Sequence, residues 1–113
     1  MNNNFDRDKL RKWFGEHPHC SVCKMSKADA FHHITGRSYP ECKSILNAAP
    51  VHNQQCHLYK SGWLHLPKNE VVLLTITYRK LMRLGYKLVK IDRQFMDRYK
   101  HHYALVTGQN PMF

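Results

Sequence analysis

The sequence predicts an α+β fold in which two short strands precede two longer helices. Residues 28–35 and 44–51 have the composition of short strands, and residues 52–60 follow them as a short helix. Residues 69–84 and 92–105 carry apolar side chains at helical spacing. The chain has 113 residues, which is the length of a single domain.

The first expected element is a short N-terminal helix. Asp6 is a favourable N-cap, and Leu10, Trp13 and Phe14 then share one face of the helix. Gly15 suits the position just past its end, where the backbone often turns left-handed.

Turn-forming residues bound the two strands and the short helix that follows them. Gly36 ends the first strand, and Pro40 lies in the loop between the strands. Asn47 is expected to break the second strand, and Ser61-Gly62 is expected to stop the short helix.

The last third of the chain combines helical periodicity with many cations. Gly85 ends its first helix, and Asp92 is expected to cap the second. The cations are Arg79, Lys80, Arg83, Lys87, Lys90, Arg93, Arg98 and Lys100. They form either a surface that follows a phosphate backbone or an ordinary solvated face. The aromatic residues between them are expected in the core, and these are Tyr78, Tyr86, Phe95, Tyr99 and Tyr103.

The chain is strongly basic, with 18 Lys and Arg against 8 Asp and Glu, a formal net charge of +10 and a pI near 9.7. Such an excess favours polyanionic partners, nucleic acid first and an anionic membrane surface second, although a soluble protein can also be basic without either. No apolar run approaches the roughly 18 residues of a membrane span, and the N-terminus lacks the apolar segment of a secretory signal. The expected location is the cytoplasm, that of the host cell if a phage encodes the protein.

The cysteines indicate a metal site. In a reducing cytosol they are not expected to form disulfides, and the spacing of Cys20 and Cys23 is that of one half of a tetrahedral metal site. The alternative is that the cysteines are small buried hydrophobic residues.

A second group of chemically active residues lies on the strand–strand–helix unit. His32 and His33 are adjacent, Asn47 follows His33 by fourteen residues, and His57 follows it by twenty-four. Neighbours on a strand point to opposite faces, so one histidine can bind a metal while the other faces a substrate. The alternative is a surface histidine pair on an ordinary strand.

This pattern resembles the HNH endonucleases of the ββα-metal superfamily, particularly small phage-type members. The matching stretches are residues 30–37, residues 47–51 and Cys56-His57, and the upstream Cys20-x-x-Cys23 matches members with a structural zinc. The resemblance covers roughly residues 17–62.

The resemblance implies a chain of three parts. An N-terminal helix occupies residues 1–16, and an HNH nuclease core with a zinc knuckle occupies residues 17–66. A basic helical extension occupies residues 67–113.

The resemblance also implies a role for each matching residue. His32 and His57 are ligands of one catalytic divalent ion, which is Mg, Mn, Ni or Zn. His33 is the general base that activates water, a task that suits the pKa of imidazole. Asn47 stabilises the loop and orients this base.

The helix of this chain departs from the family in one respect. Relatives with a histidine at the position of His32 add a second histidine on the helix, where Ser61 stands here. Asn53 lies on the same helix face, and a water or phosphate oxygen is the other candidate for that ligand position. Arg37, just past the first strand, is expected to bind a phosphate.

Family members with a structural zinc have its other two ligands near the second strand and the helix. This chain has His52 and Cys56 there, so the expected ligands of one structural zinc are these two residues with Cys20 and Cys23. Cys42 is the rival for the fourth position. A zinc is expected because a unit of roughly 45 residues barely supports a core.

The expected function is that of a metal-dependent endonuclease that hydrolyses the phosphodiester bonds of DNA, with RNA as the other candidate substrate. Arg37, Arg79, Arg83 and Lys87 are the expected nucleic-acid contacts. The alternative is a non-catalytic zinc-finger module that binds nucleic acid through the same cysteines and basic helices. His33 separates the two, because a binding module needs no base beside a metal ligand.

Overall fold

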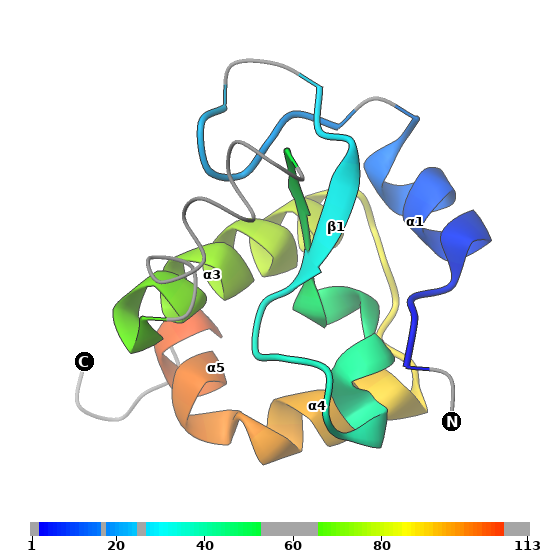
Figure 1. Cartoon of the computed structure of the whole chain (residues 1–113). Coiled ribbons are helices and arrows are strands. Elements are labelled where there is room, and N and C mark those ends of the chain that lie inside the picture. The colour runs from blue at the N-terminus through cyan, green and yellow to red at the C-terminus, as the bar shows by residue number, and fades with distance from the viewer. Residues whose placement is uncertain (1–2, 17, 25–26, 53–65, 108–113) are drawn as a thin grey trace.

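The structure is a computed structural model that describes residues 3–16, 18–24, 27–52 and 66–107 (Figure 1). The elements in chain order are α1 (Arg7–Phe14), β1 (Ala30–His33), the 3₁₀ turns η1 (Pro40–Lys43) and η2 (Ile45–Asn47), β2 (Ala48–Val51), α3 (Pro67–Arg83), α4 (Lys90–Arg98) and α5 (Lys100–Thr107). Two antiparallel strands beside several helices confirm the predicted α+β class. The helix expected over residues 52–60 falls almost entirely outside the described residues.

Helix α1 forms as its sequence predicts. The side chain of Asp6 accepts hydrogen bonds from the backbone N–H groups of Asp8 (3.0 Å) and Lys9 (3.2 Å), which have no partner within the helix. Gly15 ends the helix at φ 80°, a conformation that favours glycine. Leu10 and Phe14 are buried, so one face of α1 belongs to the core.

The two strands form an antiparallel hairpin in which His33 lies opposite Ala48 and His32 opposite Ala49. The second strand is shorter than residues 44–51, so that prediction is wrong for its first half. The Ser44 hydroxyl accepts the N–H of Leu46 (3.2 Å) and begins the turn η2 instead. This turn directs the Asn47 side chain into the protein, where it is fully buried.

The C-terminal helices share one hydrophobic core with α1 and the hairpin. Helix α3 contacts β2 and η2, α4 contacts η1, and α5 lies along α3 (Figure 1). Leu73, Leu81 and Phe95 from these helices are buried in the same cluster as Leu10 and Phe14 of α1. Among the described helices, none has the length and apolar character needed to cross a membrane.

The aromatic residues of the last third lie in this core, as expected. Tyr86, Phe95 and Tyr103 are buried, and Tyr78 and Tyr99 are half-buried. Edge-to-face contacts of Tyr103 with Phe95 and with Tyr78, both at 5.9 Å between ring centroids, join α5 to α4 and α3.

Asp92 is not the N-cap of its helix, which corrects the prediction. Helix α4 begins at Lys90, and the buried carboxylate of Asp92 accepts the N–H of Val89 (3.0 Å). It also accepts the hydroxyls of Ser44 (2.8 Å) and Tyr86 (2.5 Å). Val89 and Tyr86 precede Asp92 by three and six residues, whereas Ser44 lies 48 residues away, so local and distant donors together satisfy the buried carboxylate.

The single helix expected over residues 92–105 is two helices. The backbone leaves the helical conformation at Tyr99 (φ −110°, ψ 34°), between α4 and α5. This break turns α5 back so that it packs along α3 (Figure 1).

Candidate functional site

A groove of about 990 Å³ lies between α1 and β1, and we call it the α1–β1 groove. His32 and His33 line it from β1, and Arg37 lines it from the following loop. Residues alternate between the faces of a strand, so Phe31 and His33 lie on one face and His32 on the other. His32 is only 3% exposed, whereas His33 is half-buried.

The segment before α1 covers His33 and orients its ring. Phe5 stacks on the imidazole with 4.0 Å between ring centroids and 13° between planes. The Nε2 atom of His33 lies 3.0 Å from the carbonyl oxygen of Asn3. A carbonyl oxygen can only accept, so Nε2 carries a proton and the lone pair of the neutral ring lies on Nδ1.

Asn47 ties together the loop that follows His33. Its Oδ1 accepts both the N–H and the hydroxyl of Thr35, each at 2.9 Å. Its Nδ2 donates to the carbonyls of Cys42 (2.9 Å) and Gly36 (3.3 Å). The backbone carbonyl of Asn47 also accepts the N–H of Ile34 (2.9 Å). All four polar positions of this buried amide are therefore used, and they fix the chain immediately after β1.

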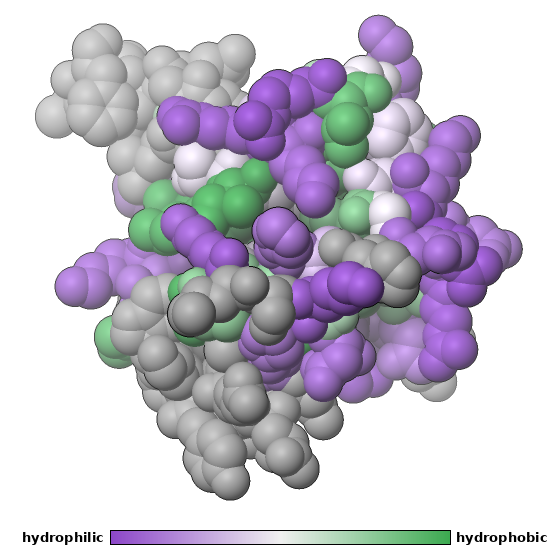
Figure 2. All heavy atoms as spheres, turned by 90° about the horizontal axis from the view of Figure 1, so that it is seen from above, coloured by the Kyte–Doolittle hydropathy of each residue, from purple (hydrophilic) through white to green (hydrophobic). Residues whose placement is uncertain are grey.

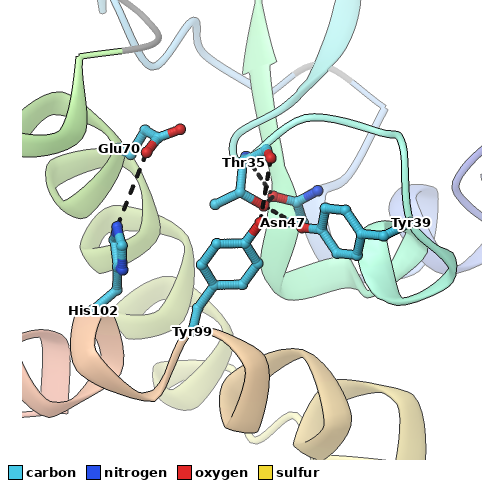
Figure 3. A network of polar contacts seen from close by, with 6 residues as sticks. All are labelled: Thr35, Tyr39, Asn47, Glu70, Tyr99 and His102. Carbon is cyan, nitrogen blue, oxygen red and sulfur yellow. Dashed lines mark hydrogen bonds and ion pairs between the residues drawn. The ribbon is translucent and has the colours of Figure 1, made fainter.

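Two tyrosine hydroxyls meet at Thr35, that of Tyr39 from the same loop and that of Tyr99 from the end of α4 (Figure 3). The hydroxyl of Tyr39 is hydrogen-bonded to the hydroxyl of Thr35, and the hydroxyl of Tyr99 donates to the Thr35 carbonyl (3.4 Å). Burial raises the pKa of Tyr39, so its hydroxyl stays protonated at neutral pH. Arg98 of α4 covers the ring of Tyr39 at 4.3 Å, which links α4 to this loop.

A separate polar pair joins α3 to α5. Nε2 of His102 lies 3.9 Å from Oε1 of Glu70 (Figure 3). Burial raises the pKa of Glu70, and burial together with neighbouring His101 lowers the pKa of His102. Both shifts favour the neutral forms, so this pair is a weak ion pair.

Cys20, Cys23 and His52 form a group that could hold a metal ion such as zinc, and we call it the Cys/His group. Their ligand atoms all lie within 4.8 Å of one another, and Sγ of Cys23 is 3.3 Å from Nδ1 of His52. Sulfur and nitrogen ligands of a tetrahedral zinc are separated by about 3.5–3.8 Å, from bond lengths of about 2.3 and 2.0 Å. The donor types and their spacing therefore fit zinc.

Backbone hydrogen bonds position the residues of this group. The N–H of Val22 donates to Sγ of Cys20 (3.4 Å), and the N–H of Lys24 donates to the Cys20 carbonyl (2.9 Å). Lys24 has φ 59°, which closes the tight turn. The N–H of Ser21 donates to the carbonyl of Pro50 in β2 (2.7 Å). The knuckle is thus attached to β2, and His52 follows that strand directly.

The other two cysteines have different positions. Cys42 is buried in the main core, its Sγ donates to the Asn3 carbonyl (3.7 Å), and burial raises its thiol pKa. It is not a member of the Cys/His group, so the structure does not support Cys42 as the rival fourth ligand. Cys56, the preferred fourth ligand, lies outside the described residues.

The expected catalytic metal ligands are placed only in part. His32 is buried on β1, and His57, Asn53 and Ser61 lie outside the described residues. Within residues 3–16, 18–24, 27–52 and 66–107, the Cys/His group is the one set of three metal-binding side chains close enough to share an ion.

The expected nucleic-acid contacts separate into two surfaces. Arg37 lies in the α1–β1 groove and donates to Oδ1 of Asn4 (2.8 Å). Arg79, Arg83 and Lys87 are exposed on α3 and the following loop. Hydrophilic side chains also cover much of the side that α1 occupies, on the right of Figure 1 and Figure 2.

Four residues at the groove were missed in the sequence. Asn3 and Phe5 contact His33, and Arg7 and Arg11 of α1 line the same groove. The available signal was the charge of α1, which carries four cations in eight residues. No sequence signal placed Asn3 or Phe5 beside His33.

Comparison of the chain with family models, with curated proteins and with solved structures found no match in any of the three. The geometry of the α1–β1 groove and of the Cys/His group is therefore the basis for assigning a function.

Proposed function

We propose that this protein is a metal-dependent nuclease of the HNH type that uses His33 as its general base. The observation that carries the proposal is the set of hydrogen bonds made by Asn47. This buried amide fixes the loop immediately after His33 through Thr35, Gly36 and Cys42. A base is effective only when it is held at the reacting atom, and a fully bonded amide is an effective way to hold it.

The surroundings of His33 support the role of a base. The Asn3 carbonyl selects the ring form with a proton on Nε2, and Phe5 restricts rotation of the ring. The lone pair on Nδ1 can then accept a proton from water near neutral pH. Arg37 lies beside it in the groove, where its guanidinium can bind the phosphate under attack.

The proposal includes a divalent ion held by His32 and His57. Such an ion would stabilise the negative charge that develops on the phosphate during hydrolysis. His33 removes the proton of the attacking water, and Asn47 acts on the reaction only by positioning His33. We further propose that Cys56 completes a structural zinc site with the Cys/His group.

The alternative function is a zinc-bound nucleic-acid-binding module without catalysis. The observation in its favour is the Cys/His group, whose three donors are assembled independently of the α1–β1 groove. Such a module would bind nucleic acid and would leave it intact whatever residue stands at position 33.

Plasmid cleavage separates the two functions. The wild-type protein is expected to nick or cut plasmid with added Mg, Mn or Ni and to lose this activity in EDTA. His33→Ala should lower the rate by about 10²–10⁴-fold, the usual contribution of a general base, while nucleic-acid affinity stays the same. His101→Ala is the matched control, because His101 is exposed on α5. Equal rates for wild type and His33→Ala would exclude His33 as the base.

A further inference from the structure

The α1–β1 groove carries cations that the nuclease proposal does not use. Arg7 and Arg11 line it from α1, and they are four residues apart, so they lie on the same helix face. The two lysines of α1 point elsewhere, since Lys9 lies over the ring of Tyr86 and Lys12 over that of Trp13. With Arg37 on the opposite wall, three guanidinium groups face one groove.

Aromatic rings lie beside these cations. Phe5 and Phe31 both line the groove, and both are half-buried, so part of each ring is accessible from it. Their remaining surface is occupied, because Phe5 stacks on His33 and Phe31 packs against Phe14 at 5.3 Å. These contacts hold the two rings in fixed orientations.

We infer that the α1–β1 groove binds a single nucleic-acid strand, with its arginines on successive phosphates and unpaired bases against Phe5 and Phe31. The inference rests on the proposed function, because it names the substrate of the same site. Single-strand sites combine a positive groove with aromatic faces, since stacking on a base needs no particular base identity.

A duplex would contact the arginines of this groove and would leave its aromatic rings without a partner. Its bases are paired inside the helix, so it offers phosphates to the arginines and nothing to Phe5 and Phe31. The groove also carries Glu16 and Asp29, which repel phosphates. A polyanion is therefore confined to the part of the groove that the arginines line, and a flexible strand follows such a path more readily than a stiff duplex.

The cationic surface of α3 is a less suitable place for a single strand. Arg79 and Arg83 are exposed there, also four residues apart. Tyr78 lines a hollow with these two arginines and is half-buried, and one edge of its ring packs against Tyr103. The surface of α3 therefore offers one partly exposed ring beside two arginines, whereas the α1–β1 groove offers two rings beside three.

Fluorescence anisotropy of labelled oligonucleotides tests the inference. The full wild-type chain is used without added Mg, Mn or Ni, so that cleavage is avoided and the His33 ring on which Phe5 stacks is kept. The probes are oligothymidine, oligouridine and a mixed-sequence duplex of equal length. Either single strand is expected to bind at least about tenfold more tightly than the duplex. Oligothymidine and oligouridine share phosphates and unpaired bases, so tight binding of either supports the inference, and their ratio identifies the preferred sugar. Equal affinity for the duplex and both single strands would overturn it.

Two pairs of variants locate the binding surface. Phe5→Leu with Phe31→Leu should weaken single-strand binding by about 5- to 150-fold for each base that loses its stacking partner. Arg7→Glu with Arg11→Glu should lower the salt slope by about 1.4, from about 0.7 for each phosphate. Arg79→Glu with Arg83→Glu is the matched control, with equal charge change and helical spacing.

Failure of this inference and failure of the nuclease proposal are distinguishable. Anisotropy detects binding without cleavage, and plasmid cleavage by the wild-type protein detects catalysis. The arginine variants replace exposed side chains, so they remain informative if the phenylalanine variants fold poorly. A salt slope unchanged by Arg7→Glu with Arg11→Glu would show that the strand binds elsewhere.

Discussion

Replacement of Asn47 by alanine tests the feature on which the proposed function depends. The Asn47 side chain is fully buried and makes four hydrogen bonds, two as acceptor from Thr35 and two as donor to Gly36 and Cys42. At about 1 kcal/mol for each net hydrogen bond, the side chain contributes about 4 kcal/mol to the free energy of unfolding. Small domains have about 5–15 kcal/mol in total, so the variant should be folded only marginally.

Asn47→Asp separates the two hydrogen bonds that the side chain accepts from the two that it donates. Aspartate has the same shape and keeps an oxygen for the N–H and hydroxyl of Thr35. It replaces the donating amide with an oxygen that faces the carbonyls of Gly36 and Cys42. Because it also buries a charge without a cationic partner in these bonds, we expect it to be at least as destabilising as Asn47→Ala.

The measurement is urea denaturation followed by circular dichroism at low temperature, with zinc at the same saturating concentration for every variant. Gln94→Ala is the matched control, because Gln94 is an exposed amide on α4 and should change stability by less than about 0.5 kcal/mol. A loss below about 1 kcal/mol for Asn47→Ala would refute the argument that these hydrogen bonds stabilise the loop.

Two further predictions concern the metal and the pH dependence. Cys20→Ser should lose bound zinc and have a lower melting temperature, because metal binding in so small a unit contributes directly to folding. Cys42→Ala should keep its zinc. The zinc stoichiometry of each purified variant tests both expectations. The folded chain lowers the pKa of His102, so the unfolded chain binds more protons and stability is lost as pH falls through about 6.5. His102→Gln should therefore lose less stability than wild type between about pH 7.5 and pH 5.5, and equal losses in urea denaturation would contradict this direction.

The features that neighbouring residues decide could be predicted from the chain alone. Asp6 and Gly15 bound α1 as expected, because capping depends on hydrogen bonds within one turn. The spacing of Cys20 and Cys23 predicted one half of a metal site, which is a local property of a turn. The resemblance to nucleases with a structural zinc, rather than a local feature, predicted His52 as a third donor, because His52 lies 29 residues from Cys23 in the chain.

Residues whose partners are distant in the chain could not be assigned in this way. Asp92 has the composition of an N-cap, yet it is the third residue of α4, and the hydroxyl of Ser44, 48 residues away, bonds its buried carboxylate. Phe5 gave no signal of a site, and it joins His33 because α1 packs against the hairpin. Burial of a polar group requires that every donor and acceptor find a partner, and which partners are near depends on how the elements pack.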